Sequence, residues 1–176
     1  MAIPFENNWR APRLAWAVLL CGLWAAPAYA CSPEGATVKS QHGDWQLVCR
    51  PPPAGAKNEI CAVVQCVTAE DNQNVGLTAM VQKFSDGQII LRVVTSLGVV
   101  LDKGLGIQID DGKEITVSFD RCFVVGCQVL YPLKAPELAK LKSGKTVLFI
   151  VYRTKEAGIG IPVSLAGFGQ ALNGLR

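Results

Sequence analysis

The segment Thr146-Val-Leu-Phe-Ile-Val-Tyr152 is the strongest candidate for a buried strand in this chain of 176 residues. Its β-branched and aromatic residues favour extended structure. Upstream, the hairpin signal Ser85-Asp-Gly87 leads into a second apolar segment, residues 88–95. Both segments predict a fold built on strands.

The rest of the chain continues this pattern outward from those two segments. Further strands are expected at residues 45–49, 59–68, 76–84, 105–109 and 114–119, with a hairpin around Cys122 and Cys127. Helix is scarce: residues 135–142 have Pro136 near a first turn and Gly144 just beyond the end, and residues 169–175 could form a last helical turn. Short, regularly spaced strands without alternating long helices predict an all-β sandwich.

The first thirty residues are typical of a cleavable signal peptide. Arg10 and Arg13 precede an apolar run at residues 14–26, and Ala28-Tyr29-Ala30 forms a small-residue cleavage site. The apolar run is shorter than the roughly 20 residues that span a bilayer. We therefore expect an exported protein, periplasmic or associated with the outer envelope, in which residues 31–176 form one domain. Lipidation of Cys31, directly after the cleavage site, is the less favoured alternative.

The charge of the predicted mature chain argues against a nucleic-acid partner. Removing residues 1–30 leaves 15 basic and 13 acidic residues, a net charge of +2. The densest basic group, Lys140, Lys142 and Lys145, lies beside a predicted turn, where a solvated face explains it. No membrane span is expected after cleavage.

Six of the seven cysteines follow the predicted cleavage site, as expected for an oxidising compartment. A tight hairpin could join Cys122 to Cys127, and Cys49 and Cys61 could close the Pro-rich segment between them. Cys61 and Cys66 are five residues apart, so on one strand they point to opposite faces and are not expected to pair.

Metal, redox and catalytic motifs are weak in this chain. The cysteine spacings are not those of zinc sites, no Cys-x-x-Cys motif is present, and His42 is the only histidine. We expect no metal, no cofactor and no catalytic residues. His42 is better explained as a loop or strand-edge residue than as part of a triad.

A series of short motifs resembles the invasion-associated locus B proteins of Gram-negative bacteria. It runs from Gly43-Asp-Trp-Gln-Leu-Val-Cys49 through Glu59-Ile-Cys-Ala-Val-Val-Gln65 and Gly104-Leu-Gly-Ile-Gln-Ile-Asp110. It continues with Arg121-Cys122 and Gly126-Cys127, and ends in Gly158-Ile-Gly-Ile-Pro-Val-Ser-Leu-Ala-Gly-Phe168. The resemblance covers nearly all of the predicted mature chain.

This resemblance implies an immunoglobulin-like β-sandwich with disulfides 49–61 and 122–127. Cys31 and Cys66 are extra to the family pattern. Either they form a third bridge that ties the N-terminal arm to the domain, or Cys31 is modified and Cys66 is buried and reduced. The family name refers to host-cell entry, but it establishes no catalytic residues.

The leading hypothesis is therefore a non-enzymatic envelope protein that binds a protein or another envelope component. Such a function needs an exposed apolar patch or an open sheet edge. Tyr131, Tyr152 and Phe168 are candidate contacts, although core positions are favoured for them, and for Trp45 more strongly still. The alternatives are a small envelope enzyme or thiol-redox protein that uses Cys31 and Cys66 or a pocket at His42, and a small-molecule binder between the sheets.

Overall fold

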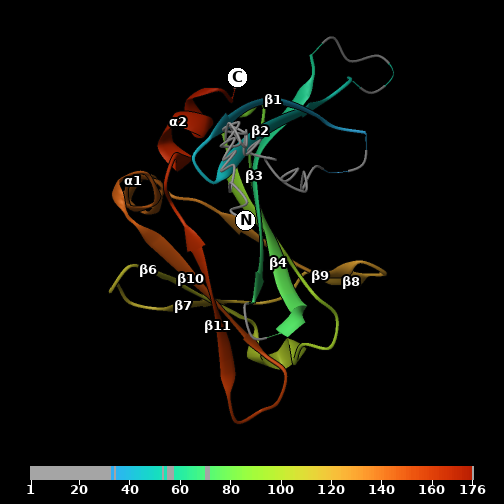
Figure 1. Ribbon diagram of the computed structural model, residues 1–176, viewed down its shortest axis with the longest axis vertical. Coiled ribbons are helices and arrows are strands. Elements are labelled where there is room, and N and C mark those ends of the chain that lie inside the picture. The colour runs from blue at the N-terminus through green and yellow to red at the C-terminus, as the bar shows by residue number, and fades with distance from the viewer. Residues whose placement is uncertain (1–32, 34, 53, 55–57, 70–71, 176) are drawn as a thin grey trace, which may run out of the picture.

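The computed structural model describes residues 33, 35–52, 54, 58–69 and 72–175. Their strands form two antiparallel sheets, which Figure 1 shows as two layers. The larger sheet has seven strands in the order β1-β2-β3-β4-β5-β9-β8, and the smaller has four in the order β11-β10-β6-β7. The predicted β-sandwich is confirmed. The predicted signal peptide, residues 1–30, and Cys31 lie outside the described residues.

The strand bounds follow the predicted segments closely at the centre of each sheet. The larger sheet comprises β1 Thr37–His42, β2 Trp45–Arg50, β3 Ile60–Ala69, β4 Asn72–Lys83, β5 Ile89–Thr95, β8 Arg121–Phe123 and β9 Gly126–Pro132. The smaller sheet comprises β6 Leu105–Ile109, β7 Ile115–Val117, β10 Thr146–Tyr152 and β11 Gly158–Ser164. Strand β4 begins at Asn72, before the expected start at residue 76, and β7 is shorter than expected. Strands β1 and β11 were not expected.

Both predicted helices are present. Helix α1 (Ala135–Ser143) has Pro136 in its first turn, and the Glu137 side chain accepts a hydrogen bond from the Lys134 backbone N–H at 2.8 Å. This bond satisfies one of the donors that a helix start leaves unpaired. Helix α2 (Phe168–Asn173) follows β11, and the 3₁₀ turn η1 (Leu101–Lys103) precedes β6.

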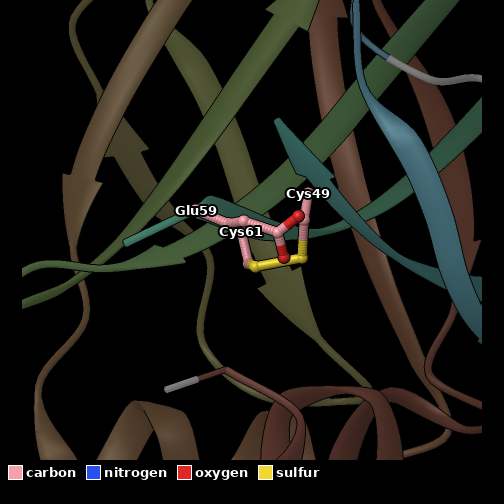
Figure 2. Close-up of side chains that lie close together, drawn as sticks. All are labelled: Cys49, Glu59 and Cys61. Atoms are coloured by element: carbon pink, nitrogen blue, oxygen red, sulfur yellow. A yellow bond between two sulfur atoms is a disulfide. The ribbon is translucent and has the colours of Figure 1, made fainter. Parts of the chain in front are cut away.

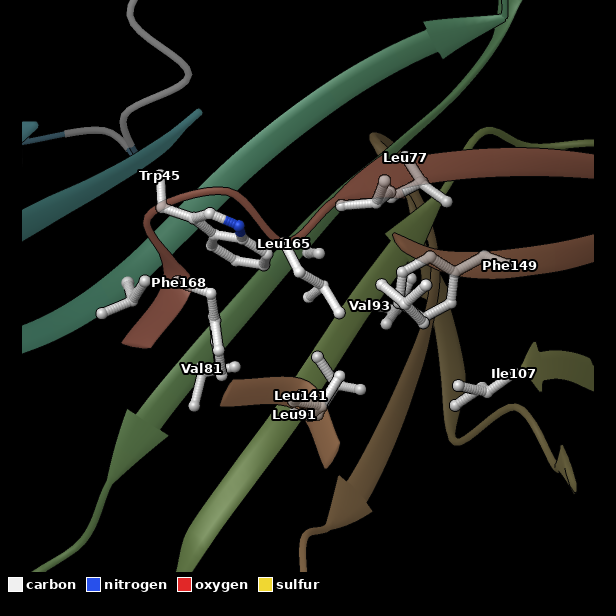
Figure 3. Close-up of a cluster of buried hydrophobic side chains, with 14 of the residues drawn as sticks. Trp45, Leu77, Val81, Leu91, Val93, Ile107, Leu141, Phe149, Leu165 and Phe168 are labelled. Atoms are coloured by element: carbon white, nitrogen blue, oxygen red, sulfur yellow. The ribbon is translucent and has the colours of Figure 1, made fainter. Parts of the chain in front are cut away.

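The hydrophobic core lies between the two sheets and under both helices. Figure 3 shows Trp45, Phe149, Phe168 and their neighbours converging there from both layers. Phe149 lies on β10, the strand whose sequence is the strongest signal of burial, and is 1 % exposed. Alternate residues of β10 are buried in the pattern expected for a strand with one face on the core.

The turn after β6 is held by a carboxylate. Asp110 adopts a positive φ of 47°, and its side chain accepts hydrogen bonds from the backbone N–H groups of Lys145 and Thr146, at 3.0 and 2.9 Å. The bonds from Thr146 first and Lys145 second lower the pKa of Asp110. Backbone hydrogen bonding therefore accounts for Asp110, as the Asp-Asp-Gly pattern indicates.

Candidate functional site

The β8–β9 hairpin carries the most exposed apolar side chains among the described residues. In Figure 1 it projects from the side of the molecule. Phe123 is 41 % exposed, Val124 93 % and Val125 77 %. We refer to these three residues as the hairpin tip. Three consecutive exposed apolar residues are unusual on a soluble surface and are typical of an interaction site.

A disulfide and a glycine restrain the hairpin tip. A disulfide joins Cys122 to Cys127, which are also register partners in the β8–β9 ladder. Gly126 has a φ of 148°, and a Cβ atom there would overlap the Thr95 carbonyl oxygen on β5. Glycine is therefore required where β9 leaves the tip and joins the sheet. The tip is held in one geometry by its own local structure.

The base of the hairpin has its charges paired. One oxygen of the Asp120 carboxylate accepts hydrogen bonds from the Gln128 amide at 2.7 Å and from Arg121 Nε at 2.8 Å. The bond from Gln128, and then the bond from Arg121, lower the pKa of Asp120. Arg121 is thus not an isolated cation beside the apolar tip.

The tip is continuous with a shallow depression on the larger sheet. Val125 lines this depression of about 320 Å³ together with Thr78, Val94 and Ser96. The depression lies over β3, β4 and β5, so the projecting side chains and the adjoining sheet surface form one face. This face combines an apolar projection with a floor of mixed polar and apolar side chains.

Cys49 and Cys61 form the second local disulfide, between register partners of β2 and β3. Figure 2 shows the Glu59 carboxylate beside the two sulfur atoms, and these three residues are close enough to share a metal ion. The sulfurs are bonded to each other, however, and metal binding needs thiolates. Glu59 is paired with Lys39 at 2.9 Å. The cluster is explained as a disulfide with a neighbouring surface ion pair.

Cys66 lies on the opposite face of β3 from Cys61, as their spacing predicts. Cys61 packs against the inter-sheet core, whereas Cys66 is exposed. Cys66 is disulfide-bonded, and its sulfur lies 3.1 Å from the Thr78 hydroxyl. The alternative of a buried, reduced Cys66 is therefore wrong. Cys31 lies outside the described residues, so the pair Cys31–Cys66 remains a prediction.

His42 lies at the end of β1, where its Nε2 is 3.0 Å from the Ser40 hydroxyl. Its register partner across the ladder is Trp45. The strand-edge interpretation agrees with this position. In the described part of the chain, the group of potential metal ligands involves Cys49, Glu59 and Cys61, and His42 is not among them.

The aromatic residues proposed as contacts occupy different environments. Phe168 is 1 % exposed and Trp45 is 2 % exposed, so both are core residues. Tyr152 is partly buried beneath the Lys103 ammonium, 5.8 Å from the ring centroid. Sequence reasoning missed Phe123 and the two valines after it. Their position between two cysteines that could close a tight hairpin was the available signal, because a short turn cannot bury its own tip.

A separate cavity of about 190 Å³ opens between the sheets beside α1. Tyr131 of β9 lies in its wall and donates a hydrogen bond of 2.6 Å to Glu137. Burial first, and then this bond, raise the pKa of Tyr131 to about 12. Burial also raises the pKa of Glu137, but the hydrogen bonds from Tyr131 and the Lys134 backbone outweigh it and leave that pKa lowered.

We expect the Tyr131 phenol to ionise near pH 12 instead of at its ordinary value of 10. The neutral phenol is favoured in the folded state. The raised pKa of Tyr131 therefore contributes fully to the stability of the folded protein below pH 10, and this contribution is lost as the pH rises towards about 12. Phenolate absorbance of residues 31–176 carrying Tyr152→Phe, in which Tyr131 is the sole tyrosine, measures this directly. Adding Glu137→Gln should lower the midpoint, and an unchanged midpoint would refute the assigned hydrogen bond.

The chain lacks a membrane-crossing helix within the described residues, none of its helices there being long and apolar enough. Residues 45–176 match the family model of the invasion associated locus B (IalB) protein. Invasion protein B homologs from Brucella abortus strain 2308 and from its biovar 1 strain 9-941 are each 28 % identical over 175 residues, 97 % of both chains.

A solved structure supports the same fold. The crystal structure of invasion associated protein B from Bartonella henselae superposes with a TM-score of 0.66 at 23 % identity, over 78 % of this chain and 94 % of that one. The family match begins at Trp45 and covers both helices, the two local disulfides and every strand given above except β1. This chain therefore belongs to the invasion associated locus B family.

Proposed function

We propose that this protein is an exported, non-catalytic binding protein of the bacterial envelope, and that the hairpin tip is its contact with a protein partner. The observation that carries this proposal is the exposure of Phe123, Val124 and Val125 on a hairpin closed by a disulfide. The signal-peptide pattern of residues 1–30 and the disulfides support export to the periplasm or outer envelope.

The rigidity of the hairpin favours binding. A partner that buries the tip has little loop entropy to remove, because the disulfide and the sheet already fix the backbone. Apolar side chains that enter a preformed pocket then contribute most of their burial free energy.

A protein partner suits the charges around the tip better than an anionic membrane does. Electrostatic membrane binding uses clusters of four to eight lysines or arginines, on the order of 1 kcal/mol each. Arg121 is the basic residue next to the tip, and it is paired with Asp120. The tip therefore has no basic cluster of its own among the described residues.

The sheet edge offers a second mode of contact at the same place. Strand β8 ends the larger sheet and pairs only with β9 in the described part of the chain. Its outer edge can donate and accept backbone hydrogen bonds from an added strand. A partner that contacts this edge would also lie against Phe123.

We expect Val124→Asp to weaken binding of the mature protein to bacterial envelope vesicles by at least about tenfold, because a charge would enter an apolar contact. Binding should be saturable and should disappear when the vesicles are treated with protease. The assay is a titration of fluorescently labelled protein against sedimented vesicles.

Val38→Asp provides a matched control, because it makes the same substitution at another exposed position, 39 % accessible on β1. It should leave binding unchanged. Equal effects of the two variants would refute the tip as the contact. Binding to protein-free liposomes, or binding that survives protease, would replace the protein partner with a lipid one. No saturable binding would refute the proposal itself.

A further inference from the structure

We propose that the cavity between the sheets beside α1 binds a single-chain amphipath, with its hydrocarbon chain inside and an anionic head group at the mouth. This site is separate from the hairpin tip, since none of residues 123–125 lines it. The proposal stands on the shape and lining of the cavity together with the charges at its opening.

The interior of the cavity is apolar on both sides. Ile107 and Ile115 line it from the smaller sheet, Leu91 lines it from the larger sheet, and Leu141 lines it from α1. A cavity of about 150 Å³ lined by such residues holds a benzene ring and stays dry. The volume of about 190 Å³ therefore suits a short hydrocarbon chain better than ordered water.

The mouth of the cavity carries two lysines from different elements. Lys113 comes from the turn between β6 and β7, and Lys140 comes from α1. In the described part of the chain, neither ammonium group forms an ion pair with a carboxylate. Lys140 acts electrostatically on the Glu137 carboxylate without forming such a pair, so both ammonium groups can still contact an anionic head group.

The one carboxylate in the lining is already engaged. Glu137 accepts from the Tyr131 hydroxyl with one oxygen and from the Lys134 backbone N–H with the other. Glu137 keeps its negative charge, so the two lysines and this one carboxylate give the lining a net charge of +1, which favours an anionic ligand over a cationic one. An apolar interior beneath two cations is complementary to a chain that ends in a negative group.

Octanoate is a suitable probe, and we expect it to bind residues 31–176 with a dissociation constant of about 1 mM or below. Calorimetry measures the affinity. Methyl NMR locates the site, with shifts expected at Ile107 and Ile115 and none at Val124 or Val125. Shifts confined to other methyl groups would refute the location. The readout is independent of any protein partner, so failure of the hairpin proposal would not affect it.

Charge reversal tests the head-group site. Lys140→Glu should weaken octanoate binding by about tenfold, and Lys113→Glu should act in the same direction. Lys142→Glu is the matched control, because Lys142 lies on the same helix and does not line the cavity. It should leave the affinity unchanged. Equal losses in the Lys140 and Lys142 variants would refute specific recognition of the head group.

The nature of the ligand is tested with three analogues and one variant. Octylamine and 1-octanol should bind at least about tenfold more weakly than octanoate, and equal binding would refute an anionic head group. Octyl phosphate distinguishes a phosphate from a carboxylate preference. Ile115→Phe, which adds volume at a partly buried wall position, should abolish binding without unfolding the protein. Retained binding would place the chain elsewhere.

Discussion

Trp45→Ala should lower the free energy of unfolding by about 4 kcal/mol, the range typical for removing a buried indole. Trp45 is 2 % exposed, and its ring meets Phe168 edge to face with the centroids 4.9 Å apart. Its indole N–H donates to the Ser164 carbonyl oxygen on β11 at 2.8 Å. The Trp45 side chain thus links the larger sheet, the smaller sheet and α2. Figure 3 shows Trp45 and Phe168 close together at one end of the core.

Urea unfolding of residues 31–176, followed by circular dichroism, measures this loss. Trp45→Phe is the conservative control. It keeps an aromatic ring but leaves the Ser164 carbonyl without its donor, so a smaller loss of about 2 kcal/mol is expected. If Trp45→Ala does not fold, the Phe variant still tests the idea. Losses below about 1 kcal/mol in both variants would contradict the role given to Trp45.

The double variant Cys49→Ser, Cys61→Ser should lose about 3 kcal/mol of stability while keeping the native fold. The two positions remain register partners without the bond, so the native ladder can persist. The main effect is on the unfolded chain, which regains the freedom of the loop between two cysteines 12 residues apart. A longer closed loop gives a larger effect.

Cys122→Ser, Cys127→Ser is the matched comparison, because its cysteines are separated by only five residues. We expect a loss of about 2 kcal/mol there, smaller than for the first pair. Denaturant titration of both double variants under oxidising conditions gives the comparison, with Cys66 left unchanged. A larger loss for the short loop would contradict the loop-length explanation and would give the hairpin a structural role beyond its tip.

The strands best predicted from the sequence are those whose own residues show a clear strand pattern. Residues 105–109 and 146–152 were expected as strands and are β6 and β10. A run of β-branched and aromatic residues has few alternatives to a buried strand. The opposite faces of Cys61 and Cys66 follow from the period of two along β3, whatever the strand packs against.

The missed strands depend on neighbours distant in sequence. Strand β1 is mostly exposed and is held by its ladder with β2. Strand β11 contains three residues, Gly158, Gly160 and Pro162, that disfavour strand by propensity. Its pairing with β10 overrides that propensity. Proline is tolerated there because β11 is the edge of the smaller sheet.

Neither proposed binding site could be derived from the sequence alone, for two different reasons. The hairpin tip is a local segment whose place between two cysteines indicates a tight turn, but that signal does not show whether another part of the fold covers Phe123, Val124 and Val125. Only the sheet order, which puts β8 at the edge, leaves the tip exposed. The cavity is lined by Lys113 with Lys140 and by Leu91 with Ile107. These residues lie on different elements, and no spacing in the sequence predicts that they line one cavity.

The sequence by itself determined the β-rich fold class, the faces of the strands and the cysteines available for pairing. These properties arise from local periodicity and residue chemistry, which act over a few residues. The tertiary structure decided which apolar residues stay exposed, which side chains meet across the sandwich and where packing leaves a cavity. Those outcomes depend on how the two sheets and α1 are brought together, and burial is a property of that assembly and not of any one segment.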